Sequence, residues 1–421
     1  MNFPIISCPP EVRREVDFYK DLLGNYYKAF TAVFCGYYLG ISSFSNIVRY
    51  LFFSPSVSNM SAMMNCPDLF MKLNRRHRKR ILSLLRKSKK DSSRYRWVID
   101  DTIIPHWGKN IWGTYLWKDH NTDGYIYGHK LMLLGLVDTK RKVLIPVFWE
   151  ILHREDKRKE SIHKKGWEVA LDLLNQAVQF GFPQYTVLMD SWFAGKELFE
   201  KLNNAGFSFV IELKSNRKVV KYKRTTFYES VKIFFSNRFR HKIWYLNRPK
   251  WASSAILTLN EMKDKVKVVA VANKKGLAHE CFAYYATNQL AWDATKVWGL
   301  ARDRWSIEVQ FRDLKQLFAL GGAAVRSNQS VETSISITMI ALTVVRLEQL
   351  KRVDANENQY KRPCSASSIV QQTLIESLHR GISKLAASDN IKIMNKLRRR
   401  LKSANFGKKP TEKLENVKNT A

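Results

Sequence analysis

Cysteine is scarce in this chain of 421 residues, where only five occur. They are scattered along the sequence at Cys8, Cys35, Cys66, Cys281 and Cys364. Their number is odd, and no pair has the CxxC or Cys/His spacing of a zinc site. We therefore exclude a disulfide framework and a structural zinc site, and we expect a reduced, cytoplasmic protein.

Long apolar runs are also absent. The most apolar stretch, residues 29–53, is interrupted by three serines, Asn46 and Arg49, whereas a membrane-spanning helix needs about 20 mostly apolar residues. Residues 1–18 lack a basic segment followed by an apolar one, so we expect no secretory signal. These two absences predict that the protein has no membrane partner.

Acidic residues are few relative to basic ones. The 71 Lys and Arg residues outnumber the 37 Asp and Glu residues and give a net charge of +34. The hydrophobic share of 45% is that of an ordinary globular protein, which argues against general disorder. Such an excess of positive charge indicates a large acidic partner, and nucleic acid is the commonest one.

The chain divides into five segments by residue pattern. The pattern predicts helices in residues 1–92, an α/β region in 93–215 and a β-rich, basic region in 216–290. It predicts helices again in residues 291–350, and helices with a basic tail in 351–421. The second segment has the order three strands, helix, strand, helix, strand. This order predicts an α/β fold with a mixed sheet.

The first segment carries two features that are typical of DNA-binding proteins. Two short helices around the Ser-Pro turn at residues 54–56 are compatible with a helix-turn-helix unit, although such helix pairs are also common elsewhere. A basic run follows, with Arg75, Arg76, Arg78 and Lys79 at its start. We expect these four cations to contact phosphates; the alternative is a solvated helix face.

Acidic residues at strand ends need an explanation in so basic a chain. Asp100 and Asp101 end the apolar run WVI, and Asp190 ends TVLM. Glu308 lies between apolar neighbours on a predicted helix, where an unpaired carboxylate is uncommon. Each acid alone has an ordinary interpretation as a cap, a turn residue or a salt-bridge partner. Together, at the strand ends of an α/β sheet, they indicate a site.

Three stretches carry a family resemblance. In order, VIDDTIIPHWGK, VLMDSWFAGKELFEKL and RDRWSIEVQFRDLKQLFALGG resemble the catalytic blocks of DDE transposases from bacterial insertion sequences. The third is the most specific, because the family pattern Tyr-x2-Arg-x3-Glu-x6-Lys falls on Arg304, Glu308 and Lys315. Ala301 occupies the Tyr position and departs from the pattern. The resemblance covers residues 30–350.

The resemblance implies a ribonuclease H-like core, interrupted by a β-rich insert and flanked by helical N- and C-terminal regions. It implies that Asp100, Asp190 and Glu308 are the catalytic residues and the ligands of two Mg²⁺ ions, with Mn²⁺ able to substitute. Hard divalent ions prefer such carboxylate oxygens. The family's Asp-x-Thr pattern selects Asp100 with Thr102, whereas an alignment on Asp-Thr selects Asp101, which remains the alternative first ligand.

Further residues are expected to contact DNA. Arg304 and Lys315 fall on nearly the same helix face as Glu308 and are predicted to bind phosphates; an exposed salt-bridge stripe would show the same spacing. Trp244 lies among basic residues of the insert, where an indole can stack on a flipped base. Trp298 or Trp305 can supply the aromatic group missing at position 301. Alternatively, these tryptophans pack in the core.

The resemblance thus implies a DDE transposase that binds the inverted repeats of its element, cleaves DNA with two metal ions and joins the 3′-hydroxyl end to target DNA. Its partner would be double-stranded DNA, bound by a homodimer, and it would take no small-molecule substrate. It would act in the bacterial cytoplasm at the nucleoid. Two alternatives are a catalytically inactive DNA-binding derivative and a ribonuclease H-like nuclease without strand transfer.

Overall fold

The computed structural model describes residues 6–386 with gaps. The residues outside the description are 1–5, 52–53, 88–91, 107, 109, 120–122, 155–163, 223–226, 237, 239–240, 246–247, 274–280, 319, 356–363 and 387–421.

Most helices lie in the first and last parts of the chain. The helices are α1 (Pro10–Asp17), α2 (Lys20–Leu23), α3 (Tyr27–Tyr38), α4 (Phe44–Tyr50), α5 (Val57–Met64), α6 (Leu69–Lys87), α7 (Gly166–Gln179), α8 (Lys196–Asn204), α9 (Val231–Ser236), α10 (Ala294–Asp303), α11 (Trp305–Gln316), α12 (Asn328–Ala355) and α13 (Ala366–Ala386). Of these, α7, α8 and α9 lie among the strands. Short 3-10 turns are η1 (Gly24–Tyr26), η2 (Ser92–Arg94) and η3 (Ser191–Phe193).

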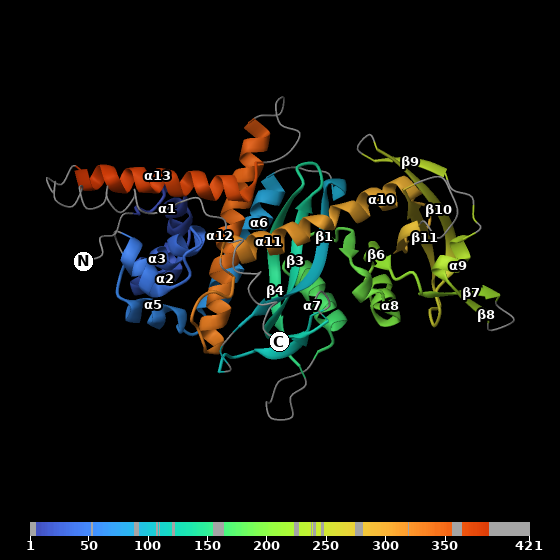
Figure 1. The fold of residues 1–421 in the computed structure, drawn as a ribbon, viewed down its shortest axis with the longest axis horizontal. Coiled ribbons are helices and arrows are strands. Elements are labelled where there is room, and N and C mark those ends of the chain that lie inside the picture. Colours follow the sequence, from blue (N-terminus) through green and yellow to red (C-terminus); the bar gives the residue numbers. More distant parts are fainter. Residues whose placement is uncertain are drawn as a thin grey trace, which may run out of the picture.

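The strands occupy the middle of the chain. They are β1 (Tyr95–Pro105), β2 (Tyr115–Lys118), β3 (Tyr125–Asp138), β4 (Val143–Leu152), β5 (Val187–Met189), β6 (Phe209–Leu213), β7 (Lys218–Tyr222), β8 (Phe227–Ser230), β9 (His241–Tyr245), β10 (Arg248–Thr258), β11 (Lys265–Ala272) and β12 (Cys281–Thr287). In Figure 1 the helices α1, α3 and α5 lie at one end, the sheet around β1 in the middle, and β7 to β11 at the other end.

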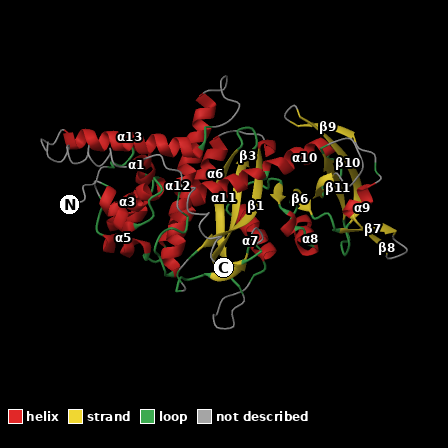
Figure 2. Cartoon of the chain, in the orientation of Figure 1, coloured by secondary structure: helices red, strands yellow, loops and turns green. Residues whose placement is uncertain are grey.

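One mixed sheet organises the molecule. Its order is β2-β3-β1-β5-β6-β12-β11-β10-β9, and β4 also pairs with β3. The strands β1, β3 and β4 are antiparallel neighbours, whereas β5 is parallel to β1 and β6 is parallel to β5. The crossover helices α7 and α8 make these parallel connections possible. The predicted α/β fold with a mixed sheet and helical flanking regions is confirmed (Figure 2).

Strand alternation divides the core into two layers. Trp97 and Ile99 of β1 pack on one face in a cluster with Leu173 of α7. Val98 points to the other face, where it belongs to the same buried cluster as Ile307 and Leu314 of α11. The residue after Ile99 therefore emerges on the α11 side of the sheet.

The β-rich segment extends this sheet directly. Strand β12 pairs antiparallel with β6, and β11, β10 and β9 follow outward, while β7 and β8 form a separate two-stranded sheet. Helix α10 packs against β6, β9, β11 and β12, and α11 follows it across β1 and β4 (Figure 1). Hydrogen bonds thus join the predicted insert to the core.

Helix α12 connects the helical region to the sheet. It packs against α3, α5, α6 and β4. Residues 328–354 are long and apolar enough to cross a membrane by length and composition, but 83% of the most apolar window is buried inside the protein. This composition is therefore accounted for by a core position. The two short helices expected around the Ser-Pro turn are α4 and α5, which begin at the side-chain caps Ser43 and Ser56.

Candidate active site

Arg304 brings two of the predicted acids together. Asp100 lies in β1, and Glu308 lies in the first turn of α11. The Arg304 guanidinium donates from Nη1 to Asp100 Oδ2 at 3.2 Å and from Nη2 to Glu308 Oε1 at 2.9 Å. Asp190 directly follows β5, the parallel neighbour of β1, and its charge acts on Asp100. Residues more than 200 positions apart in the chain therefore meet at one point of the sheet.

A fourth carboxylate belongs to this group. Glu212 in β6 lies with Oε2 4.0 Å from Arg304 Nη2. Sequence reasoning missed it, although its context FVIEL has the same form as the runs before Asp100 and Asp190, an acid after a short apolar run. The expectation that Asp100 ends its strand is wrong, because β1 continues to Pro105. The acidic group consists of Asp100, Asp190, Glu212 and Glu308, which surround one guanidinium.

The electrostatics of the acidic group reflect burial and crowding of like charge. Burial raises the pKa of Asp100 to about 8, the neighbouring Asp190 and Asp101 contribute to this rise, and Arg304 partly offsets them. Burial likewise raises the pKa of Glu212, with Arg304 opposing the shift. Burial works against the charge of Arg304, but the surrounding carboxylates outweigh it and raise its pKa. The site therefore has more negative charge than one guanidinium balances.

Asp101 lies apart from this group. As strand alternation requires, it points to the opposite face of β1, where its Oδ2 lies 3.2 Å from the Lys130 ammonium. That ammonium also lies 4.5 Å from the ring centroid of Trp192. Of the two candidates for the first acid, the structure places Asp100 with Arg304 and Glu308, and Asp101 with a lysine.

The donor chemistry of the acidic group fits a hard divalent cation. Carboxylate oxygens are what such ions prefer, and a divalent ion would relieve the repulsion from Asp190 and Asp101 that, after burial, contributes to the raised pKa of Asp100. Within the described residues, however, no group of three or more His, Cys, Asp or Glu is arranged to share one metal ion. The Arg304 guanidinium lies between Asp100 and Glu308, so it must move before both can bind one ion.

The side chains of the predicted basic run lie on two different faces of α6. Arg76 donates to the Phe18 carbonyl at 3.1 Å and forms an ion pair with Asp21. Arg78 donates to the Val147 carbonyl at 3.3 Å. These interactions fasten α6 to the N-terminal helices and to β4. Both guanidinium groups therefore already have partners within the protein, and the predicted phosphate contacts of Arg76 and Arg78 stay predictions.

Arg75 and Lys79 lie on the other face of α6 and are exposed. With Arg86 and residues at the end of α7 they line an open hollow of about 580 Å³. Three cations around one hollow form a surface that can bind phosphate groups.

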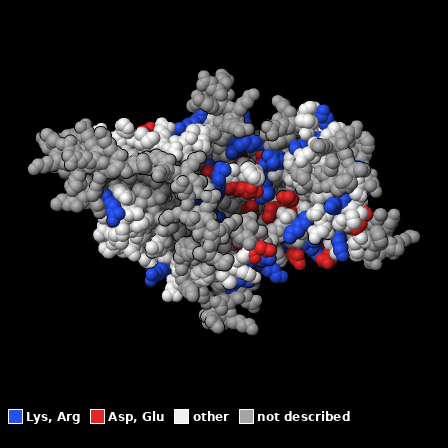
Figure 3. All heavy atoms as spheres, in the orientation of Figure 1, with Lys and Arg blue, Asp and Glu red and all other residues white. Residues whose placement is uncertain are grey.

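A second basic hollow adjoins Asp190. It measures about 480 Å³ and is lined by residues of η3, the segment before α8 and the β6–β7 connection. Its cationic side chains are Lys214, Arg217 and Lys218, and Trp192 is 46% exposed beside them. Figure 3 shows acidic side chains near the middle of the displayed face with Lys and Arg close to them. A DNA strand that reaches the acids would find cations beside them.

The predicted tryptophan contacts differ in exposure. Trp244 on β9 is 55% exposed, with the Lys242 ammonium 4.4 Å from its ring centroid. Trp298 is only 4% exposed and packs on Tyr285, so the indole is a core residue of α10 in this conformation, and its contact with DNA stays a prediction. Trp305, next to Arg304, is 57% exposed and is the better placed aromatic.

Lys315 lies toward the C-terminal end of α11 and is exposed. The structure places it two turns beyond Glu308, outside the ion pairs of Arg304. Arg304 and Lys315 therefore have different surroundings, although both were predicted to bind phosphates: Arg304 is held by carboxylates, and Lys315 lies outside these ion pairs.

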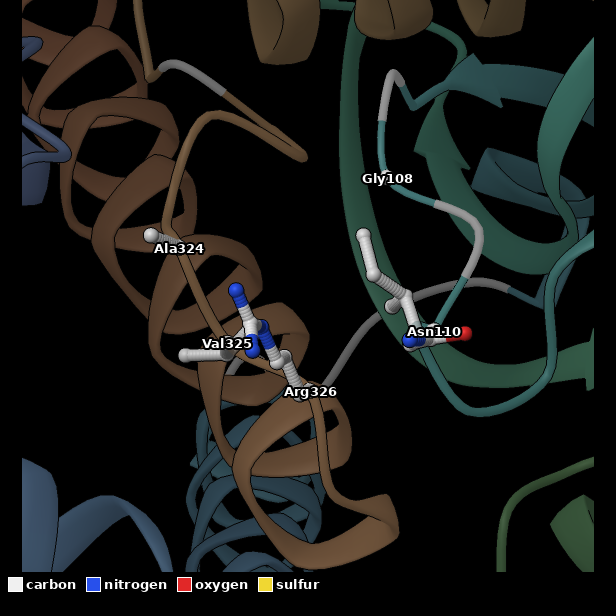
Figure 4. Close-up of a pocket in the computed structure, with 6 residues that line it drawn as sticks. Gly108, Asn110, Ala324, Val325 and Arg326 are labelled. Atoms are coloured by element: carbon white, nitrogen blue, oxygen red, sulfur yellow. The ribbon is translucent and has the colours of Figure 1, made fainter.

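A smaller hollow lies away from the acids. It measures about 300 Å³ between the β1–β2 connection and the segment that precedes α12, and Arg326 lines it together with Asn110 and Val325 (Figure 4). The Trp112 amide donates to the Arg326 carbonyl at 2.9 Å and ties the two segments together. The lining is mainly apolar and contains none of the four acids.

A buried network holds α11 in place. Arg346 of α12 donates to Asp313 Oδ2 at 2.8 Å and to Gln310 Oε1 at 3.0 Å, both on α11, and to Gln349 Oε1 at 2.9 Å on its own helix. The two α11 partners lie within two turns of Glu308. The network therefore fixes the rotation of the helix that supplies this acid.

One comparison with known proteins, a family model, matches part of the chain. A family model described as DDE superfamily endonuclease matches residues 71–227, a segment that contains Asp100 and Asp190. The predicted resemblance to DDE enzymes is confirmed by this match. Among solved structures, the piggyBac transposase in a synaptic complex with hairpin DNA aligns at 10% identity with a TM-score of 0.40, over 76% of this chain and 60% of that chain. The aligned part is thus less than two thirds of that transposase. No curated protein matches the sequence significantly.

Proposed function

We propose that this protein is a metal-dependent DDE transposase. The observation that carries the proposal is the meeting of Asp100, Glu308 and Arg304 on one face of the sheet, beside the strand that ends at Asp190. The match of residues 71–227 to a DDE endonuclease supports the same chemistry.

The acids have defined roles in this proposal. Asp100, Asp190 and Glu308 would hold two Mg²⁺ ions, which would stabilise the attacking and leaving oxygens of phosphodiester cleavage. The chain's own contribution is position: β1 and β5 present the two aspartates from adjacent parallel strands, and α11 presents Glu308 above them. The partial burial of Asp100, whose side chain is 18% exposed, strengthens the electrostatic interactions of the site.

DNA would be held by cations in two basic hollows, one of which adjoins the acids. The hollow lined by Lys214, Arg217 and Lys218 adjoins Asp190, and Arg75 and Lys79 line the hollow on α6. Lys315 and Trp244 are exposed and available to bind DNA as well. The net charge of +34 supports an extended nucleic-acid footprint.

The full reaction that we propose is transposition in the bacterial cytoplasm. A homodimer would bind the terminal inverted repeats of the element, cleave there, and join the 3′-hydroxyl ends to target DNA. Two subunits suit this reaction because each end of the element needs its own site.

The test uses the full chain, DNA carrying the repeats that flank its gene, MgCl₂ and a supercoiled plasmid target. We expect wild-type protein to cleave at the repeat ends and join them to the plasmid, as read by sequencing of the products. Asp190→Asn and Glu308→Gln should lose cleavage but keep DNA binding, whereas Glu197→Gln on the exposed side of α8 should retain both.

The alternatives give different products. Cleavage without joining would support a nuclease, and binding without cleavage in Mg²⁺ or Mn²⁺ would support an inactive DNA-binding derivative. Retained cleavage in Asp190→Asn or Glu308→Gln would contradict the assignment of the acids.

A further inference from the structure

Arg304 occupies an unexpected place for a residue that binds DNA. Its guanidinium lies 3.2 Å from Asp100 and 2.9 Å from Glu308, and 19% of its side chain is exposed. Asp190 contributes to the same electrostatic field. A guanidinium in this position neutralises the carboxylates of the protein itself. In this conformation its charge and N–H donors are therefore already paired, and it is poorly placed to bind a phosphate.

A divalent ion and this guanidinium cannot share the carboxylates. Both are cations, and the repulsion between them would be strong in a partly buried site. A metal ion bound by Asp100 and Glu308 would therefore require Arg304 to withdraw from both. The withdrawn guanidinium then needs another anion, because a buried unpaired charge is costly.

Glu212 is placed to be that anion. Its Oε2 lies 4.0 Å from Arg304 Nη2, just beyond hydrogen-bond distance, so a modest side-chain rotation would complete the bond. It lies on β6, on the far side of β5 from Asp100, so a guanidinium that turns toward it leaves the Asp100 side. Its two carboxylate oxygens are suited to the planar fork of an arginine.

We propose that Arg304 is an internal counterion that a divalent metal ion displaces, and that Glu212 is the positioning residue that receives the displaced guanidinium. The inference rests on the proposed metal-dependent function and adds two roles to it. Without metal, Arg304 keeps the acids together; with metal, the Arg304–Glu212 pair holds the guanidinium out of the metal position.

The experiment measures metal binding rather than turnover. Mg²⁺ and Mn²⁺ are titrated by calorimetry into metal-free full-length protein without DNA, for wild type, Glu212→Gln, Arg304→Gln and the double variant. Glu197→Gln, which removes one exposed acidic charge elsewhere, is the matched control. Thermal melting in EDTA shows that each variant is folded, and Arg304→Met, which also lacks the charge, replaces Arg304→Gln if the latter does not fold.

The proposal predicts that the effect of Glu212→Gln on metal affinity depends on the presence of Arg304. Glu212→Gln should raise the metal Kd about tenfold, the effect of losing one charge-assisted hydrogen bond. Arg304→Gln should lower the Kd, because the competing cation is gone. In the Arg304→Gln background, Glu212→Gln should have no further effect, and Glu197→Gln should leave the Kd unchanged in either background.

Three outcomes would overturn the proposal. An unchanged Kd in Glu212→Gln would mean that the pair does not form. An equal loss of affinity with and without Arg304 would mean that Glu212 binds the metal itself. A higher Kd in Arg304→Gln would mean that Arg304 supports the metal site. Absence of metal binding by folded wild-type protein would instead refute the proposed function, and the inference with it.

Discussion

Replacing Arg346 with methionine tests how α12 holds the helix that carries Glu308. The guanidinium is almost fully buried, with 6% of its side chain exposed, and donates to Asp313, Gln310 and Gln349 at 2.8–3.0 Å. Methionine keeps much of the length but donates no hydrogen bond. The Asp313 carboxylate, with 11% of its side chain exposed, then loses its buried partner.

The expected cost follows from this environment. Breaking a buried ion pair by removing one partner costs roughly 3–5 kcal/mol, because the remaining charge is uncompensated. Arg312 Nε lies 3.8 Å from Asp313 Oδ1 and can compensate in part. We therefore expect a loss near the lower limit, about 3 kcal/mol, and expect the double variant Arg346→Met/Asp313→Leu to recover most of it.

The assay is guanidinium denaturation followed by circular dichroism, together with hydrogen exchange of the α11 amides. Exchange in α11 should accelerate more in Arg346→Met than exchange in α7, which packs in the other layer of the core. A loss below about 1 kcal/mol with unchanged exchange in α11 would refute the idea that this network positions the helix.

Three further predictions concern other parts of the molecule. Replacing Arg75 and Lys79 with glutamine should flatten the plot of log DNA affinity against log salt by about 0.9 for each phosphate that the variant no longer neutralises, as read by fluorescence anisotropy. The free energy of unfolding should fall by about 2 kcal/mol between pH 6.5 and 5, because burial lowers the pKa of His77 from 6.5 to about 4; urea titrations at several pH values measure it. Gly128→Ala should destabilise the sheet by about 3 kcal/mol in the same titrations, since its Cβ would lie 2.0 Å from the Ile104 carbonyl oxygen.

Each of these predictions has a control. Replacing Arg76 and Arg78 should lower stability and leave the salt slope unchanged. The folded-state pKa of His77 lies below its unfolded value, so its contribution is complete above pH 6.5 and is lost as pH falls toward 4; His77→Gln should lack this component. Gly195→Ala should be tolerated, because its Cβ would meet only Glu197 Oε2 at 3.5 Å.

The order of strands and helices was predictable because local patterns carry it. Apolar runs between turn residues marked β1, β3, β4, β5 and β6, and their order with two helices sufficed for the mixed α/β fold. The pairing of β12 with β6 was not predictable, because registers between distant strands depend on tertiary packing that no short pattern encodes.

The candidate site was predictable in part. The strand-end pattern found Asp100 and Asp190, and consistent use of that pattern would have found Glu212 too. Spacing along a helix showed that Arg304 and Glu308 share a face, but not that Arg304 turns toward the protein's own acids. Which cations of α6 are exposed depends on which side of the helix packs against β4. The sequence does not show this, so Arg76 could not be distinguished from its exposed neighbours.

The positions of the four acids along the chain have a consequence during synthesis. Asp100, Asp190 and Glu212 leave the ribosome before Arg304, and on the order of 5–20 s of translation separates Glu212 from this arginine. During that interval the three carboxylates have no central cation, and their repulsion opposes the close approach of β1, β5 and β6. These three neighbouring strands are therefore expected to come together fully only when α11 emerges. A polypeptide released earlier would lack both Arg304 and Glu308, so prematurely terminated chains would carry no complete acidic group and, under the proposed function, no site able to cleave DNA.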